Sequence, residues 1–193
     1  MQKNQKSVYE TLSAFDDETG DLHVIIDTPK DSRNKYKFDE KLGLFKLGGV
    51  LPVGAFFPFD FGYIPSTRGG DGDPLDVLVL MDEPAFVGCL IPSRLIGVIA
   101  AEQTEEDGKT ETNDRLIAVA ANSRNHSDIK SLDDLNETLI GEIEHFFVSY
   151  NEAKDKEFKP LGRFGAPKAK RIIEEGMKLY KKPKGAAKAK KCK

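Results

Sequence analysis

"GGDGDPLDVLVLM", residues 69–81, places Asp71, Asp73 and Asp76 directly before an unbroken apolar run. The apolar run is too short for a helix and is rich in strand-forming residues, so it predicts a buried strand. Residues two apart in an extended segment share a face about 6–7 Å apart, which lets Asp71 and Asp73 point into one space. Asp76 joins them after the bend at the intervening proline. The stretch therefore places concentrated negative charge at the mouth of a buried strand.

Short apolar segments separated by turn residues surround this strand. Residues 56–63, "FFPFDFGY", place an aromatic ring at every second position, which predicts an extended segment with one aromatic face. The strand patterns cover residues 21–27, 35–39, 76–81, 93–103 and 114–121.

The last third of the chain has a helical pattern. Residues 131–151 open with Ser131, carry acids in the first turn and repeat apolar residues at helical spacing, so they predict an amphipathic helix from Ser131. Residues 153–167 are basic and rich in Gly and Pro, which predicts a linker, and residues 168–182 predict a second helix. Strands followed by two helices indicate an α+β domain, with the strands curled into a small barrel.

Composition limits the class of protein. The chain has 193 residues, of which 39% are hydrophobic and 32% charged, which is typical of one soluble globular domain. We predict an N-terminal extension at 1–20, a single domain at 21–180 and a disordered basic tail at 181–193. The rest of the chain is acidic, so we expect no nucleic-acid partner. No secretory or membrane-spanning segment is visible, so we expect no membrane partner and a cytoplasmic location.

The aspartate cluster allows three interpretations. An acidic turn before a strand needs no ligand, since Asp and Gly are common in turns. A calcium-binding EF-hand loop fails, because Leu75 occupies the fifth position and Asp76 replaces the turn glycine at the sixth. The third interpretation is a catalytic metal site, in which carboxylates hold a hard cation that activates water.

The motif also resembles a known family. "DGDPLDVLV", residues 71–79, is similar to the Asp-x-Asp-Pro-x-Asp-Val signature of the soluble family I inorganic pyrophosphatases, and the resemblance extends from about Asp21 to Tyr180. It implies a twisted, closed five-stranded β-barrel of OB-like form, with two C-terminal helices packed outside. It also implies hydrolysis of pyrophosphate to two orthophosphates by a metal-activated water, with Mg²⁺, or alternatively Mn²⁺, in a homo-oligomer.

The resemblance carries over to individual residues. Asp71 and Asp76 match metal ligands, and Asp73 matches the acid that takes the proton from the nucleophilic water. A further metal-ligating aspartate of the family falls on Asn113, with Asp114 one residue out of register, so either residue is a candidate. The positions that match substrate-binding residues are Asp27, Lys35, Arg115 and Tyr150.

Several positions depart from the family pattern. Lys37 and Asn151 replace a glutamate and a lysine, and Gly49 replaces an arginine. Phe57 and Phe61 replace tyrosines. The candidates to supply the missing lysine charge are Lys154, Lys156 and Lys159. A further loop acid of the family cannot be aligned, and the candidates for it are Glu102, Glu105 and Asp107. These departures leave two alternatives open, namely a protein that binds metal and phosphate with weak or no hydrolysis, and a hydrolase of another phosphoanhydride.

Overall fold

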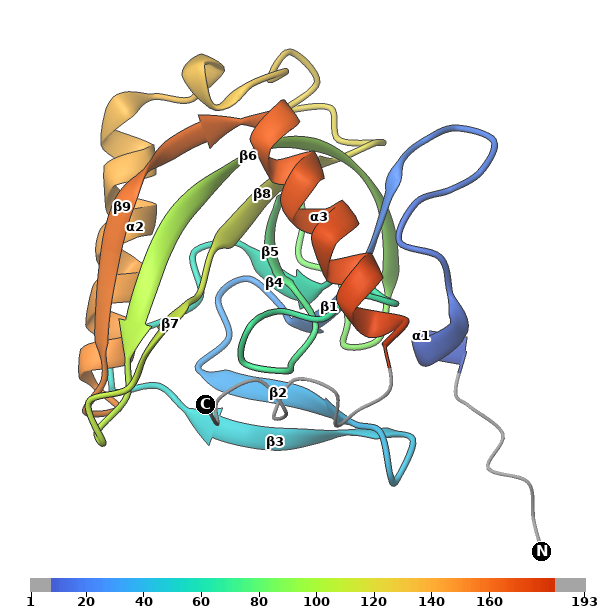
Figure 1. Ribbon diagram of the computed structural model, residues 1–193. Helices are drawn as coiled ribbons and strands as arrows, with labels where there is room; N and C mark the ends of the chain where they lie inside the picture. The colour runs from blue at the N-terminus through green and yellow to red at the C-terminus, as the bar shows by residue number, and fades with distance from the viewer. Residues whose placement is uncertain (1–7, 183–193) are drawn as a thin grey trace, which may run out of the picture.

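The structure is a computed structural model that describes residues 8–182 (Figure 1). Its elements run in the order α1 (Val8–Thr11), β1 (Leu22–Thr28), β2 (Asn34–Asp39), β3 (Leu44–Val50), β4 (Asp60–Tyr63), β5 (Asp76–Leu80), β6 (Leu90–Thr104), β7 (Thr110–Thr112), β8 (Arg115–Ala120), η1 (Leu132–Asp134), α2 (Glu137–Glu152), β9 (Glu157–Gly165) and α3 (Ala166–Tyr180).

Five strands form a closed ring. They pair in the order β1–β4–β5–β8–β6, and β6 returns to pair with β1. The β5–β8 pair is parallel, while the other pairs of the ring are antiparallel. The predicted α+β fold with a closed five-stranded arrangement and two C-terminal helices outside is confirmed.

Strand β5 shows why the ring strands read as continuous apolar runs. Leu78 and Leu80 belong to a core cluster that includes residues of α2. Val77 and Val79 alternate with them and belong to a second cluster that includes residues of α3. Because both faces of the strand are buried, no polar alternation is left in its sequence.

The predicted helix start at Ser131 is wrong. The carboxylate of Asp134 accepts hydrogen bonds from the backbone N–H groups of Lys130 and Ser131, each at 2.8 Å, and this closes the short turn η1. Helix α2 begins only after Asn136, whose side chain accepts a hydrogen bond from the backbone of Thr138. Two capping sequences follow one another here, and the first caps a separate turn.

The predicted linker at 153–167 is also wrong, because most of it forms β9. This strand pairs antiparallel with β6 from Gly97↔Gly165 to Thr104↔Glu157. Its proline, Pro160, stands where the register shifts. Proline is tolerated there because, within residues 8–182, β9 pairs with β6 alone and so lies at a sheet edge.

The aromatic stretch 56–63 is extended only in its second half, as β4. Phe57 and Phe61 still lie together, with ring centroids 5.5 Å apart, and both belong to the core beneath α2. Strand β4 passes close to β1 at Gly62, where an added Cβ would lie 2.3 Å from the carbonyl oxygen of Ile25. Only glycine permits this approach.

Strands β2 and β3 form a separate two-stranded hairpin, which lies beside the ring in Figure 1. Tyr9 of α1 contacts its rings Phe38 and Phe45, with centroids 5.1 and 5.6 Å away. The predicted domain boundaries stay a prediction. Most of the basic tail and the first seven residues of the N-terminal extension lie outside the described residues. Within residues 8–182, no helix has the length and apolar character needed to span a bilayer.

Candidate active site

A pocket of about 540 Å³ is lined by residues of the ring strands, of the β2–β3 hairpin and of the C-terminal end of α2. Of the residues predicted for the site, all but Asp114 line it. These are Asp27, Lys35, Asp71, Asp73, Asp76, Asn113, Arg115 and Tyr150.

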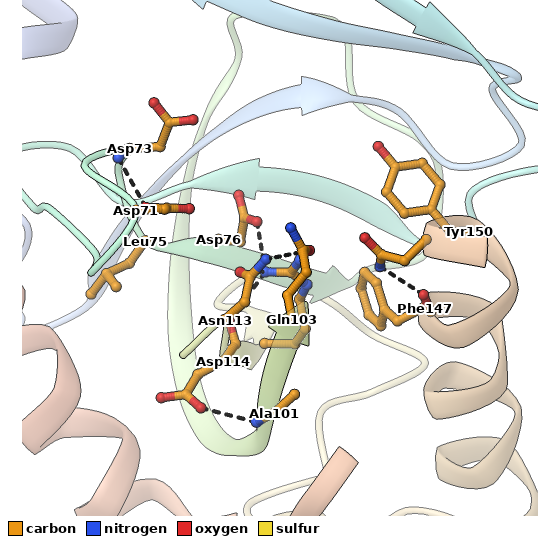
Figure 2. Close-up of polar contacts among 12 residues, drawn as sticks. Asp71, Asp73, Leu75, Asp76, Ala101, Gln103, Asn113, Asp114, Phe147 and Tyr150 are labelled. Atoms are coloured by element: carbon orange, nitrogen blue, oxygen red, sulfur yellow. Dashed lines mark hydrogen bonds and ion pairs between the residues drawn. The ribbon is translucent and has the colours of Figure 1, made fainter. Parts of the chain in front are cut away.

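The aspartate cluster forms one wall of the pocket (Figure 2). The backbone N–H of Asp73 donates a hydrogen bond of 3.0 Å to the carboxylate of Asp71. Gly72, between them, has φ +91°, a conformation that favours glycine. Burial raises the pKa of the Asp71 carboxyl; the hydrogen bond from Asp73 opposes this shift, while the charges of Asp73 and Asp76 add to it. The carboxylates are therefore crowded at the mouth of β5, as the sequence predicts.

Arg115 holds Asp76 from inside the ring. Its Nη1 donates to Asp76 at 2.8 Å and also contacts the side-chain oxygen of Asn113. The guanidinium carbon lies 5.1 and 5.3 Å from the ring centroids of Phe147 and Phe158. Its side chain is only 5% exposed. These contacts fix a permanent positive charge at the floor of the pocket.

A second cation lies on β2. Lys35 donates to both carboxylate oxygens of Asp27, at 2.7 and 2.9 Å, and its Nζ lies 4.1 Å from the ring centroid of Phe61. Phe57 lies beneath it too, at 5.7 Å. Burial raises the pKa of Asp27, although the charge of Lys35 opposes the shift. The Lys35 ammonium therefore makes cation–π contacts with the rings of Phe57 and Phe61.

Asn113 faces the pocket, and Asp114 does not. The Asp114 carboxylate accepts a hydrogen bond of 3.1 Å from the backbone of Ala101 and turns away from Asp76 in Figure 2. Burial raises its pKa. Successive residues of an extended segment point to opposite faces, so the two side chains cannot share one. Asn113 instead donates to Gln103 at 2.7 Å, and two neutral amides stand at this wall.

The β6–β7 hairpin contributes one of the three candidate acids and one acid that we did not predict. Glu105 lines the pocket, whereas Glu102 and Asp107 do not. The Glu105 carboxylate pairs with the ammonium of Lys156 at 2.7 Å. The acids that we missed are Glu40, in the turn after β2, and Glu111 on β7. Glu111 lies two residues before Asn113, and the period-two alternation of β7 is the signal that could have found it.

The segment after α2 contributes lysines. Lys154 and Lys156 line the pocket, whereas Lys159 lies on β9 outside it. Lys154 donates to the hydroxyl of Tyr150. Burial lowers the pKa of Lys154 to about 8, helped by the charges of Lys35 and Lys156. Burial raises the pKa of Tyr150 to about 12. The amide of Asn151 donates to the Phe147 carbonyl within the helix, at 2.8 Å.

The residues of the pocket fit a hard divalent cation that takes only one or two of its ligands from the protein. Within the described part of the chain, no three carboxylate, imidazole or thiol groups are clustered closely enough to hold a metal ion alone. Mg²⁺ does not need such a cluster, because proteins bind it through one or two carboxylates while water and substrate phosphate oxygens complete the sphere. The burial and like-charge crowding that raise the pKa of Asp71 are the strain that such a cation relieves.

Carboxylates for a hard cation face lysines and an arginine across one pocket. That combination defines a class of site, one for a strongly anionic ligand that carries phosphate groups.

The comparisons with known proteins name the family within this class. Residues 24–181 match the family model for inorganic pyrophosphatase. The inorganic pyrophosphatase of Halalkalibacterium halodurans is 37% identical over 161 residues, covering 83% of this chain and 95% of the relative. The crystal structure of an inorganic pyrophosphatase from Neisseria gonorrhoeae aligns with TM-score 0.81 at 32% identity, covering 91% of this chain and all of that one. The Thermus thermophilus structure gives TM-score 0.80 at 34% identity, covering 93% and 100%. The chain belongs to the inorganic pyrophosphatase family.

Proposed function

We propose that this protein hydrolyses inorganic pyrophosphate to two orthophosphates with the help of a divalent cation. The observation that carries the proposal is the shared pocket, into which the aspartates of the "DGDPLD" motif and a set of lysine and arginine side chains both open. Membership of the inorganic pyrophosphatase family supports the same reaction.

The cation would be held by Asp71 and Asp76. When bound, Mg²⁺ neutralises phosphate oxygens and lowers the pKa of a bound water. The choice of Mg²⁺ over Mn²⁺ is part of the proposal and comes from the family resemblance, since oxygen ligands suit both hard cations.

The chain's own residues supply positioning and proton transfer. Asp73 is half-exposed at the pocket mouth, where its carboxylate can accept the proton of the attacking water. Lys35 and Arg115 both line the pocket and would bind phosphate oxygens, which positions the phosphoanhydride for attack. Tyr150 and Lys154 lie together in the pocket and would donate to a phosphate group, and Lys154 supplies the charge that Asn151 lacks.

The cellular setting is also proposed. A homo-oligomer and a cytoplasmic location follow from the family resemblance alone.

Weak hydrolysis, or another phosphoanhydride as substrate, is the second candidate. The observation that favours it is the wall of two amides, Asn113 and Gln103, which adds no negative charge for a cation.

A substrate panel separates these functions. Orthophosphate release is measured from pyrophosphate, tripolyphosphate, ATP and p-nitrophenyl phosphate, each with millimolar Mg²⁺ and with excess chelator. We expect pyrophosphate to be hydrolysed fastest and the chelator to stop the reaction. A higher kcat/KM for tripolyphosphate or ATP would favour the second candidate, and binding of pyrophosphate without release would point to a binding protein.

A further inference from the structure

Lys37 places a positive charge at the aspartate cluster itself. It lies on β2, two residues after Lys35, so both side chains leave the same face of the strand and reach the pocket. Its Nζ lies 2.6 Å from the carboxylate of Asp73. Burial opposes the charged form, but the hydrogen bond and charge of Asp73, with the charges of Asp76 and Asp71, raise the pKa of Lys37. Lys37 therefore stays protonated at neutral pH.

The carboxylates at the mouth of β5 are thus largely paired with cations of the chain. Asp73 has Lys37 and Asp76 has Arg115, while Asp71 accepts the backbone N–H of Asp73 and forms no ion pair within the described residues. A divalent cation that approaches this wall meets one carboxylate without a counter-ion and two that already have one.

The Lys37–Asp73 pair contributes little to stability. Both side chains are 56% exposed. Exposed ion pairs typically contribute about 0–1 kcal/mol, because water screens them and two long side chains must be ordered. Lys37 can therefore leave Asp73 and contact an anionic ligand at little cost to the fold.

We propose that Lys37 is a built-in counter-ion of the pocket, and that its ammonium, held beside Asp73, opposes the binding of a divalent cation at the neighbouring Asp71 and Asp76. The inference deepens the proposed function and rests on it, since it concerns how this pocket neutralises pyrophosphate. The free protein then binds divalent cations more weakly than its carboxylates alone would allow, and Lys37 neutralises phosphate oxygens when pyrophosphate is bound.

The test is a titration of the full chain with Mn²⁺, in which electron paramagnetic resonance measures the free ion. Lys37→Met and Lys37→Gln are compared with wild type and with Lys46→Met. Lys46 is a matched control, because it pairs with Asp39 at 2.7 Å on the same hairpin, is 57% exposed and does not line the pocket. Circular dichroism verifies folding, and either Lys37 variant alone suffices for the comparison.

Both Lys37 variants are expected to bind Mn²⁺ about tenfold more tightly than wild type, as removal of one nearby positive charge predicts at a half-exposed site. An increase in Mn²⁺ affinity of about threefold or more that is confined to the Lys37 variants supports the proposal. A smaller change, or equal tightening in Lys46→Met, overturns it. The titration contains no pyrophosphate, so it tests Lys37 even if the wild type releases no orthophosphate. An active wild type with an unchanged titration overturns the role of Lys37 alone.

Discussion

Replacing Arg115 by methionine should remove the positive charge at the floor of the pocket and leave Asp76 without its partner. Breaking a buried pair from one side typically costs about 3–5 kcal/mol. The Asp76 side chain is 32% exposed and therefore partly solvated, which places the cost at the lower end of this range. Loss of the contacts with Phe147 and Phe158 adds to it, at about 0.5–2 kcal/mol each. Taking the lower end of each contribution, we expect Arg115→Met to lower the free energy of unfolding by about 4 kcal/mol.

A double-mutant cycle isolates the ion pair. Two unit charges about 4 Å apart interact by about 4 kcal/mol at the effective dielectric constant of a protein surface, and solvation of Asp76 reduces this to about 2 kcal/mol. Urea unfolding of wild type, Arg115→Met, Asp76→Asn and the double variant, with chelator present, gives the coupling energy. Arg124→Met, at an exposed site, is the control and should change stability by less than about 0.5 kcal/mol. A coupling energy below about 0.5 kcal/mol, the limit of additivity, would refute the reasoning.

Further predictions concern the pocket rim. Because the pKa of Lys154 is about 8, its ammonium assists anion binding below that pH and is lost as pH rises through it. The ratio of wild-type kcat/KM to that of Lys154→Met should therefore fall towards 1 between about pH 7 and 9. The same ratio for the control Lys159→Met should not change with pH. A ratio that is independent of pH for both variants would refute the role of the Lys154 ammonium. Asn113→Asp adds a carboxylate to the pocket and should tighten Mn²⁺ binding about tenfold in the same titration. Asp114→Asn should leave Mn²⁺ affinity within about twofold, and a larger loss would place Asp114 in the site.

The ring and the acidic wall were predictable because local patterns encode them. Strand β5 is recognisable by its apolar run from Val77 to Leu80, which is buried on both faces. The three aspartates Asp71, Asp73 and Asp76 stand before that run at spacings that converge in an extended chain. Such signals need only neighbouring residues.

The failures of prediction share a different cause. Strand β9 has the Gly and Pro content of a loop, and only its distant partner β6 makes it a strand. The choice between Asn113 and Asp114 depends on which face the chain presents after β7, and a shift of one residue exchanges the faces. Gln103 and Glu111 enter the pocket through the same cross-strand pair of β6 and β7, which a single strand pattern does not reveal.

The most direct test of the central claim is the initial rate of orthophosphate release from pyrophosphate by wild type and Asp73→Asn, with millimolar Mg²⁺ and with chelator. The variant keeps the shape of the side chain but cannot accept a proton, so circular dichroism should be unchanged. We predict rapid, chelator-sensitive release by the wild type and a loss of about 100-fold or more in kcat for the variant, the range typical of general base catalysis. Equal rates for the two proteins, or no release by the wild type, would contradict the account.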